Sequence, residues 1–256
     1  MRKALYCMAA AGIISFPAFA VPGVDGEISA GYIKQDISGW VDYKGTEADI
    51  EDDLKIGDEN SFFIRAKLEH PIPILPNLKL MYERMRFSGD GTVNKSYTFG
   101  DVVVNVNDRV QTKLDLDHYD FVLFYNLPFI NFLQVIDAEL GLNIRVIDFY
   151  AKVRDVTRNK EDSASFVVPI PMIHGSLEIK PVDLFSVLVE ANGIAYQGHH
   201  YYDVAGELRI KPIQTAVADL FIGLGYKYEK LKIDDIDDTS ADIKIKQPYA
   251  QIGLIF

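Results

Sequence analysis

The sequence is poor in cysteine and has no excess of basic residues. Cys7 is the only cysteine among 256 residues, so thiols can build neither a disulfide nor a zinc site nor a cysteine nucleophile. The 26 Lys and Arg residues are outnumbered by 37 Asp and Glu residues, which gives a formal net charge of -11. Because nucleic-acid recognition needs a basic face, we expect no nucleic-acid partner.

Long hydrophobic runs are also missing. After residue 20, no stretch approaches the roughly 20 consecutive apolar residues of a membrane-spanning helix. The nearest candidate, Phe121 to Ile136, is interrupted by Asn126, Pro128, Asn131 and Gln134. Spanning helices are therefore not expected. The chain is nevertheless 48% hydrophobic and 12% aromatic, which is too apolar for a disordered protein and favours one folded domain.

The first twenty residues have the three parts of an export signal. Met1-Arg2-Lys3 is a positive start, Ala4 to Phe16 is an apolar core, and Pro17 to Ala20 ends in the A-x-A pattern of a cleavage site. An N-terminal membrane anchor is the alternative, but the apolar stretch is short for a span. We predict a cleaved secretory signal peptide over 1–20, followed by a single barrel domain over 21–256.

The rest of the chain alternates between polar and apolar residues with a period of two. Ile136, Ala138, Leu140, Leu142, Ile144 and Val146 alternate with Asp137, Glu139, Gly141, Asn143 and Arg145. The same alternation recurs in 61–69, 202–210 and 218–226. It predicts β-strands with one polar and one apolar face. A secreted sandwich also alternates, but the segments are longer than ordinary strands and suit a tilted membrane crossing.

The spacing of turns predicts an all-β fold, a single antiparallel transmembrane β-barrel with short periplasmic turns and longer extracellular loops. Ten strands are expected, with eight or twelve as alternatives; they lie at 24–37, 61–70, 78–87, 114–126, 135–149, 166–179, 185–196, 202–211, 217–231 and 243–256. Short turns are expected at 71–77, 126–134, 181–184 and 212–215. Long loops are expected at 39–60, 88–110, 149–163 and 231–241.

Two segments do not fit this pattern cleanly. Leu114 and Leu116 lie on even positions, whereas Tyr119 and Phe121 lie on odd ones, and this change predicts a β-bulge in the fourth strand. The segment 97–106 is either an extension of a strand above the membrane or an additional hairpin.

The last strand ends in alternating apolar residues and an aromatic terminus. Ile252, Leu254 and Phe256 are typical of the C-terminal signal by which outer-membrane barrels are recognised for insertion, so the barrel-assembly machinery is an expected partner. An interfacial girdle is predicted from aromatic residues near strand ends, namely Tyr32, Tyr82, Phe87, Tyr196, Tyr202, Tyr226 and Tyr228.

The segment Glu69-His70-Pro71-Ile72-Pro73-Ile74-Leu75-Pro76-Asn77, the segment Leu114-Asp115-Leu116-Asp117-His118-Tyr119-Asp120 and the overall layout resemble a family of Gram-negative outer-membrane barrel proteins of about this length, without an assigned function. The resemblance implies the fold and a location in the cell outer membrane. It implies no active-site residues.

If the apolar faces contact lipid, many charged residues face the lumen. The acids are Glu27, Glu69, Glu83, Asp137, Glu139, Glu190, Asp203, Glu207, Asp219 and Glu229, and the bases are Arg65, Lys67, Lys79, Arg145, Arg209, Lys211 and Lys227. Because unpaired buried charge is costly, we expect them to form salt bridges that fill a narrow lumen. This favours a structural or surface-interaction barrel that contacts outer-membrane lipid and lipopolysaccharide. A narrow cation-preferring pore is the alternative, because acids are in excess.

Enzymatic and metal-binding functions are weaker hypotheses. An outer-membrane lipid hydrolase or protease could use His118 with Asp120, His174 with Ser176, or the pair His199 and His200 with Asp203. No G-x-S-x-G element accompanies them, so we expect no catalysis. The acidic runs at 47–59 and 234–238 lack the spacing of a calcium loop, so no metal site is expected. We also expect no cofactor and a monomer.

Overall fold

The computed structural model describes residues 23–128, 135–236 and 238–256, and all of its regular elements are strands. They are β1 (Asp25–Tyr43), β2 (Ala48–Asp49), β3 (Glu59–Glu69), β4 (Asn77–Glu83), β5 (Arg86–Thr92), β6 (Tyr97–Phe99), β7 (Val102–Val104), β8 (Arg109–Asn126), β9 (Ile136–Asp155), β10 (Lys160–Val182), β11 (Phe185–Tyr196), β12 (His199–Gln214), β13 (Asp219–Ile236) and β14 (Thr239–Ile255). Within these residues, no helix is long and apolar enough to cross a membrane. The predicted signal peptide lies outside the described residues.

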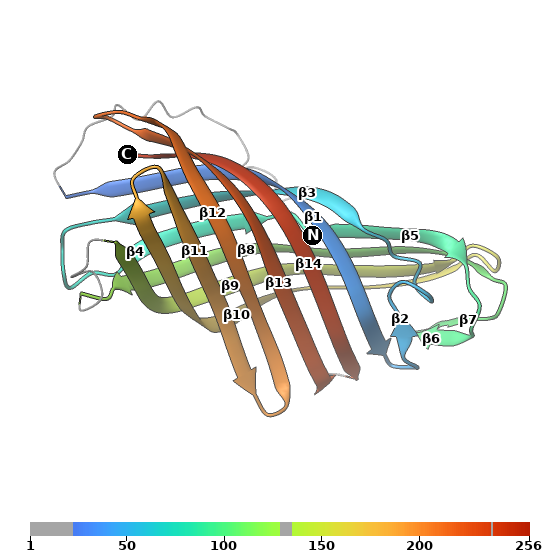
Figure 1. Ribbon diagram of the computed structural model, residues 1–256. Coiled ribbons are helices and arrows are strands. Elements are labelled where there is room, and N and C mark those ends of the chain that lie inside the picture. The colour runs from blue at the N-terminus through green and yellow to red at the C-terminus, as the bar shows by residue number, and fades with distance from the viewer. Residues whose placement is uncertain (1–22, 129–134, 237) are drawn as a thin grey trace, which may run out of the picture.

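The main sheet closes on itself (Figure 1). Sequential strands pair antiparallel from β8 to β14, β8 pairs with β4, β4 with β3, and β3 with β1. Pairing of β14 with β1, from Glu27 opposite Ile255 to Tyr43 opposite Thr239, completes the ring. β4 and β5 form one wall strand, because both pair with β8 in a single continuous register. The ten-stranded antiparallel barrel predicted from the sequence is confirmed.

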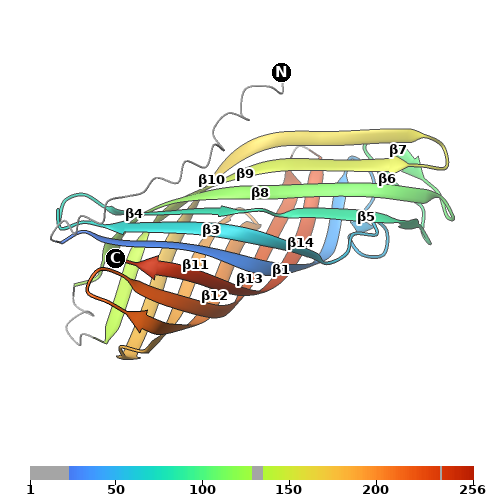
Figure 2. The same cartoon turned by 90° about the horizontal axis from the view of Figure 1, so that it is seen from above.

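The two ends of the barrel differ. The turn end has the β3–β4, β10–β11 and β12–β13 connections and the chain terminus at Phe256. At the loop end, β2 pairs with β1, and β6 pairs with β7. Figure 2 shows that β8, β9 and β10 extend toward the loop end, where β6 and β7 lie. The wall therefore continues as a β-structured extension on this side of the barrel.

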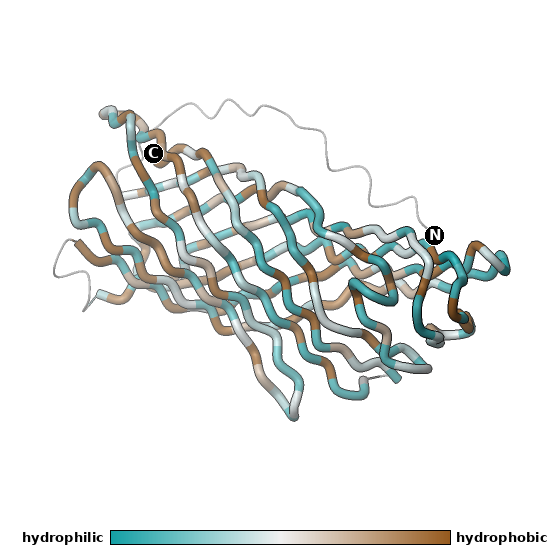
Figure 3. The backbone as a smooth tube through the Cα atoms, turned by 45° about the vertical axis from the view of Figure 1, so that its right-hand side comes forward, coloured by the Kyte–Doolittle hydropathy of each residue, from teal (hydrophilic) through white to brown (hydrophobic). Residues whose placement is uncertain are grey.

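Near the turn end, the outward face is apolar and the inward face is polar. Apolar and polar residues alternate along each strand (Figure 3). The outward residues form what we call the apolar band, represented by Ile28, Ile64, Leu80, Phe121, Leu142, Ile173, Val189, Leu208, Leu224 and Ile252, all of which are exposed. Tyr32, Tyr82, Tyr119, Tyr202, Tyr226 and Tyr228 lie on the same outward face at its loop-end edge. A band bordered by aromatic rings matches the lipid-facing surface of a membrane barrel.

Toward the loop end, the polarity of the two faces is reversed. Inward residues now form an apolar core, which we call the apolar cap; it includes Ile50, Leu54, Ile56, Phe87, Val93, Tyr97, Phe99, Val102, Val104, Val110, Leu114, Leu116, Ile147, Val153, Ile243 and Ile245. The outward residues there are charged, as in Lys113, Asp115 and Lys152. This is the arrangement of a water-soluble protein, with apolar side chains packed inside and charged side chains outside.

This reversal corrects the predicted bulge in β8. The β8–β9 register is continuous from Val110 opposite Asp155 to Asn126 opposite Glu139, and even-numbered residues face inward throughout. Leu114 and Leu116 point into the apolar cap, whereas Tyr119 and Phe121 point outward. The change in parity marks a change of environment and needs no extra residue.

Two predicted long loops are also corrected. Pairing of β9 with β10 continues to Asp155 opposite Lys160, and pairing of β13 with β14 continues to Ile236 opposite Thr239. The regions 149–163 and 231–241 are therefore mostly strand, because cross-strand hydrogen bonding continues beyond the apolar band. Segment 97–106 contains the additional hairpin, β6–β7. Phe87 is wrongly assigned to the girdle, since it is buried in the cap. The predicted 126–134 turn lies partly outside the described residues.

Gly39 is the backbone position that allows the first loop to fold inward. Its φ is +118°, and an added Cβ would lie 1.9 Å from the carbonyl oxygen of Asp242. The carbonyl oxygen of Gly39 accepts a hydrogen bond from Ile50 N at 2.9 Å. This contact brings Ile50 into the cap, and only glycine adopts this conformation without strain.

Candidate functional site in the barrel lumen

The structure places the predicted lumen charges on inward-facing strand positions. Most lie in two ion-pair networks, and the others lie at the turn-end mouth. There, Glu69 pairs with Lys67 at 2.5 Å, Asp219 with Lys211 at 3.8 Å, and Asp137 with Lys180. Lys180 was not among the predicted residues, because it lies one residue beyond the predicted end of its strand at 179.

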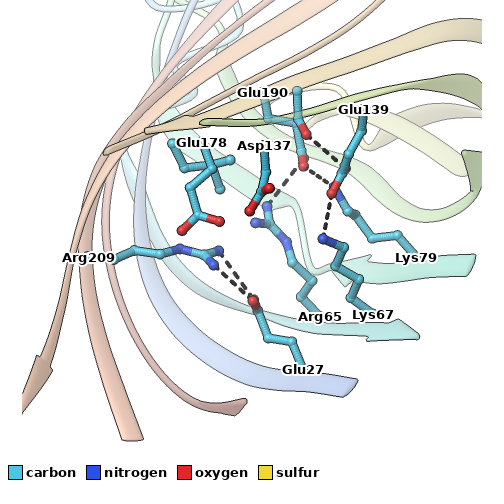
Figure 4. Close-up of a pocket in the computed structure, with 11 residues that line it drawn as sticks. Glu27, Arg65, Lys67, Lys79, Asp137, Glu139, Glu178, Glu190 and Arg209 are labelled. Carbon is cyan, nitrogen blue, oxygen red and sulfur yellow. Dashed lines mark hydrogen bonds and ion pairs between the residues drawn. The ribbon is translucent and has the colours of Figure 1, made fainter. Parts of the chain in front are cut away.

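The turn-side network is centred on Lys79 and Glu139 (Figure 4). The Lys79 ammonium lies 3.2 Å from Glu139 and 2.6 Å from Glu190. Lys67 lies 2.5 Å from the second oxygen of Glu139, and Arg65 lies 3.5 Å from Glu190. These residues come from β3, β4, β9 and β11, so the network connects strands across the lumen. Each carboxylate thus compensates two cations.

Arg209 lines the same cavity as the turn-side network and binds carboxylates on the β1 side of the barrel. Its guanidinium contacts Glu27 at 2.8 Å and Glu207 at 2.6 Å. Glu207 also accepts hydrogen bonds from Tyr249 at 2.8 Å and from Gln251. Figure 4 shows Arg209 and Glu27 facing each other on the opposite side of the lumen from Lys79.

The mid-barrel network lies between the turn-side network and the cap. Arg145, which is fully buried, contacts Asp120 at 2.7 Å and Asp203 at 2.9 Å, and it donates to Tyr201 at 3.1 Å. The Tyr201 hydroxyl donates in turn to Glu229 at 2.5 Å. The guanidinium is therefore held by side chains from β8 and β12, and Glu229 of β13 lies 3.9 Å from it.

Lys227 completes the mid-barrel network. Its ammonium lies 2.8 Å from Glu83 and 3.0 Å from Glu229. Glu83 also accepts hydrogen bonds from Gln35 at 3.1 Å and Gln247 at 2.6 Å. Four carboxylates, those of Glu83, Asp120, Asp203 and Glu229, thus surround the two cations Arg145 and Lys227. Carboxylates exceed cations at this level of the lumen.

Sequence reasoning did not assign several polar residues of these networks to the lumen. Asp120 was considered only as a partner of His118, and Tyr201, Asn192 and the glutamines were not considered. The signal was present for Tyr201, Asn192 and Gln35, because each lies on the same parity as a charged inward residue of its own strand. Gln247 and Gln251 lie on β14, whose inward positions carry no charge. Tyrosine and amide side chains are less diagnostic of a lumen than charges, since they also occur on outward faces.

The space left within the turn-side network is small. A cavity of about 20 Å³ lies among Arg65, Lys79, Glu139, Glu190 and Arg209. This volume accommodates about one water molecule. Loop-ward of the networks, the apolar cap fills the interior. Within the described residues, the lumen is therefore occupied by paired charges below and by apolar side chains above.

The histidine groups proposed for catalysis do not form triads. His174 contacts Asn192 at 2.9 Å, whereas Ser176 donates to Glu139. Asp120 is bound to Arg145, and His118 lies 3.8 Å from Glu83. His200 stacks on Tyr202 on the outward face, whereas Asp203 is buried in the lumen. The alternation of β12 thus places His200 and Asp203 on opposite sides of the wall. His199 has the same parity as Asp203, and its Nδ1 accepts a hydrogen bond from Asp234 N at 3.1 Å.

The acidic loop at 47–59 folds through its own carboxylates. Asp49 accepts hydrogen bonds from Glu51 N at 2.9 Å and Asp52 N at 2.8 Å, and Asp53 accepts from Asp49 N at 2.9 Å. Within the part of the chain that the structure describes, no group of three or more acidic, histidine or cysteine residues is arranged to hold a metal ion. Part of the second acidic run, Asp237, lies outside the described residues.

An exposed ion pair holds β5 against β8 above the apolar band. Arg109 contacts the two carboxylate oxygens of Asp90 at 2.8 and 2.9 Å, and Gln111 donates to the same carboxylate at 3.0 Å. Hydrogen bonds from Arg109 and Gln111 stabilise the ionised form and lower the pKa of Asp90 to about 2. These contacts join side chains of β5 and β8 on the outer surface, beside the backbone pairing of the two strands.

Closure of an even number of antiparallel strands, the outward apolar band and the charged interior define the fold as that of an outer-membrane β-barrel. Comparison with protein-family models and with curated sequences gave no match. The chain is similar in structure to the outer membrane protease OmpT from Escherichia coli, at 12% identity and a TM-score of 0.44, covering 92% of this chain and 96% of that one. It is also similar to Ail of Yersinia pestis, at 12% identity and a TM-score of 0.33, covering 91% and 99%. A third similar structure is OprG from Pseudomonas aeruginosa, at 11% identity and a TM-score of 0.33, covering 91% and 96%.

Proposed function

We propose that this protein is an integral outer-membrane barrel with a closed lumen, whose role lies in the surface that its loop end presents outside the cell. The observation that carries this proposal is that paired charges and apolar side chains occupy the described lumen and leave only a small cavity of about 20 Å³ within the turn-side network. Ion-pair networks occupy the membrane level, and the apolar cap occupies the loop end. A barrel built to pass solutes would need a continuous polar path, and apolar side chains close this one.

The membrane placement rests on the outward face of the barrel. Its apolar band and tyrosine border provide a surface suited to lipid, while the charged extension suits water. The loop end then faces the exterior, and the turn end faces the periplasm. In this placement the partners are outer-membrane lipid, lipopolysaccharide and, during insertion, the barrel-assembly machinery. The closed ring needs no second copy to complete it, so we propose a monomer.

Single-channel recording tests the closed lumen. Protein purified from outer membranes of expressing cells, and shown to be folded by a heat-modifiable gel shift, is added to a planar bilayer. We expect no steady conductance from the wild type. The matched variants are Arg145→Ala, in the lumen, and Arg154→Ala, on the exposed extension. Steady conductance steps from the wild type would overturn the closed-lumen proposal.

A narrow cation-preferring pore is the second candidate. It is favoured by the surplus of carboxylates around Arg145 and Lys227, which would attract cations if the cap opened. The same recording separates the two functions. Cation-selective steps from the wild type would establish the pore, whereas anion-selective steps would contradict both candidates.

A further inference from the structure

Four lysines gather on the outward face of β13 and β14, next to the loop-end edge of the apolar band. We call Lys230, Lys232, Lys244 and Lys246 the lysine patch. Lys230 and Lys244 are directly opposite each other in the β13–β14 pairing, and Lys246 lies opposite Tyr228. Like charges directly opposite one another destabilise a sheet. The repulsion between the opposed ammonium groups therefore destabilises this part of the sheet, and a bound anion would offset that repulsion.

The carboxylates near the lysine patch are too few to neutralise it. Asp242 lies 3.4 Å from Lys230 and directly opposite Lys232 in the β13–β14 pairing, and Asp36 is opposite Lys246 in the β1–β14 pairing. The nearby Lys34 is paired with Asp58 at 2.7 Å. Among the described residues, no ion pair engages Lys232, Lys244 or Lys246. Lys244 and Lys246 are exposed, so their ammonium groups are accessible to a ligand.

The patch lies at a defined depth relative to the membrane surface. Along β13, the outward residues change from Leu224 in the apolar band to Tyr226 and Tyr228, and then to Lys230 and Lys232. Tyr202 of β12 is opposite Lys230, and its ring lies 6.3 Å from that of Tyr228. Tyrosines mark the level of lipid headgroups, so the ammonium groups lie at or just above that level.

From this arrangement we infer that the lysine patch binds the phosphate groups of lipopolysaccharide in the outer leaflet. The ammonium groups supply the charge, and Tyr202 and Tyr228, which are opposite Lys230 and Lys246 in the strand pairing, offer hydroxyl donors beside them. The apolar band below contacts the acyl chains. Basic clusters beside a membrane attract anionic headgroups in this way. The inference rests on the proposed outer-membrane placement.

A second pair of opposed lysines provides the matched control. Lys113 and Lys152 are directly opposite on the outward face of β8 and β9. They lie further along the extension, beyond Asp117 and Asp115, and Lys152 pairs with Glu161 at 2.8 Å. The control pair thus shares the chemistry of the patch but lies away from the tyrosine border and has a carboxylate partner.

The test measures binding of lipopolysaccharide to detergent-purified, delipidated full-length protein, through the rise in the temperature of the heat-modifiable gel shift. The variants are Lys230→Gln/Lys244→Gln/Lys246→Gln and the control Lys113→Gln/Lys152→Gln, with Lys246→Gln alone if the triple variant does not fold. We expect the triple variant to bind lipopolysaccharide at least about tenfold more weakly than the wild type. The single variant should lose less affinity, and the affinity of the control variant should be unchanged.

Two further ligands identify the source of the phosphate. We expect dephosphorylated lipopolysaccharide to bind the wild type as weakly as phosphorylated lipopolysaccharide binds the triple variant. Stabilisation by inorganic phosphate equal to that by lipopolysaccharide would overturn the lipid assignment. Equal binding of lipopolysaccharide by wild type and patch variant would overturn the site. Absence of the protein from the outer-membrane fraction would instead contradict the proposed function.

Discussion

Leu116 and Tyr119 lie three residues apart on β8 and point to opposite sides of the barrel wall. Leu116 is 7% exposed and faces the apolar cap, whereas Tyr119 is 43% exposed and faces outward. Between them the strand changes from a membrane wall to the wall of a soluble domain without losing register. The proposed function assigns a closed lumen to the membrane-spanning part and a folded extension to the loop end. It rests on this change in the polarity of the two faces of the wall.

Replacing the buried guanidinium of the mid-barrel network should be strongly destabilising. In Arg145→Ala, Asp120 and Asp203 lose their main cation inside a closed lumen, and breaking a buried ion pair costs about 3–5 kcal/mol. We expect the unfolding transition in urea, followed by the gel shift, to move to lower denaturant. Arg154→Ala removes an exposed pair and should change stability by about 0–1 kcal/mol. Equal transitions for the two variants would contradict a structural role for the network.

Shortening a cap residue should loosen the loop end. Ile50 is 0% exposed, and replacing a buried isoleucine with alanine costs about 2–5 kcal/mol. In Ile50→Ala we therefore expect faster limited proteolysis within 44–58, with the gel shift of the barrel retained. Val103→Ala, at an exposed position of β7, should leave the cleavage rate unchanged. An unaltered cleavage pattern in Ile50→Ala would show that the loop is held by other contacts.

The backbone at Gly39 gives a prediction with a glycine control. Gly39→Ala places a Cβ against the Asp242 carbonyl and forces a non-glycine residue into a strained region, a cost of about 1–3 kcal/mol. We expect less folded protein in the membrane fraction at equal expression. Gly206→Ala is the comparison, since no atom lies within 4 Å of the added Cβ. If both variants accumulate like the wild type, the closeness of β1 and β14 at Gly39 is not essential.

A charge placed on the apolar band tests the membrane placement directly. Leu224 is 59% exposed on the outward face, two residues before Tyr226, and an arginine on the lipid face costs about 2–4 kcal/mol at the bilayer midplane and less toward the interface. Leu224→Arg should reduce assembly of heat-modifiable protein in outer-membrane fractions. Val103→Arg, equally apolar in the parent but on the loop-end hairpin, should assemble normally. Normal assembly of Leu224→Arg would place the membrane elsewhere on the barrel.

Strand β8 shows what the residue pattern alone cannot decide. The sequence contains the change in parity at Leu116 and Tyr119, but a bulge and a change of environment give the same pattern. Only the unbroken register of β8 with β9 distinguishes them. The long loops predicted at 149–163 and 231–241 were wrong for a related reason. In these two segments the outward residues are polar, as they are in a loop. They can be recognised as strands only once it is known that the inward apolar residues pack in the apolar cap.

Period-two alternation determined that the chain forms long strands, favoured ten of them, and assigned most of the charged residues near the turn end to the inward face. Tertiary structure decided which charges meet. Arg209 pairs with Glu27, which is 182 residues away, and Lys227 pairs with Glu83 across 144 residues. Parity assigns a side chain to a face but not to a height, because height depends on the tilt and stagger of all the strands together. Partners across the lumen are therefore fixed only when the ring closes.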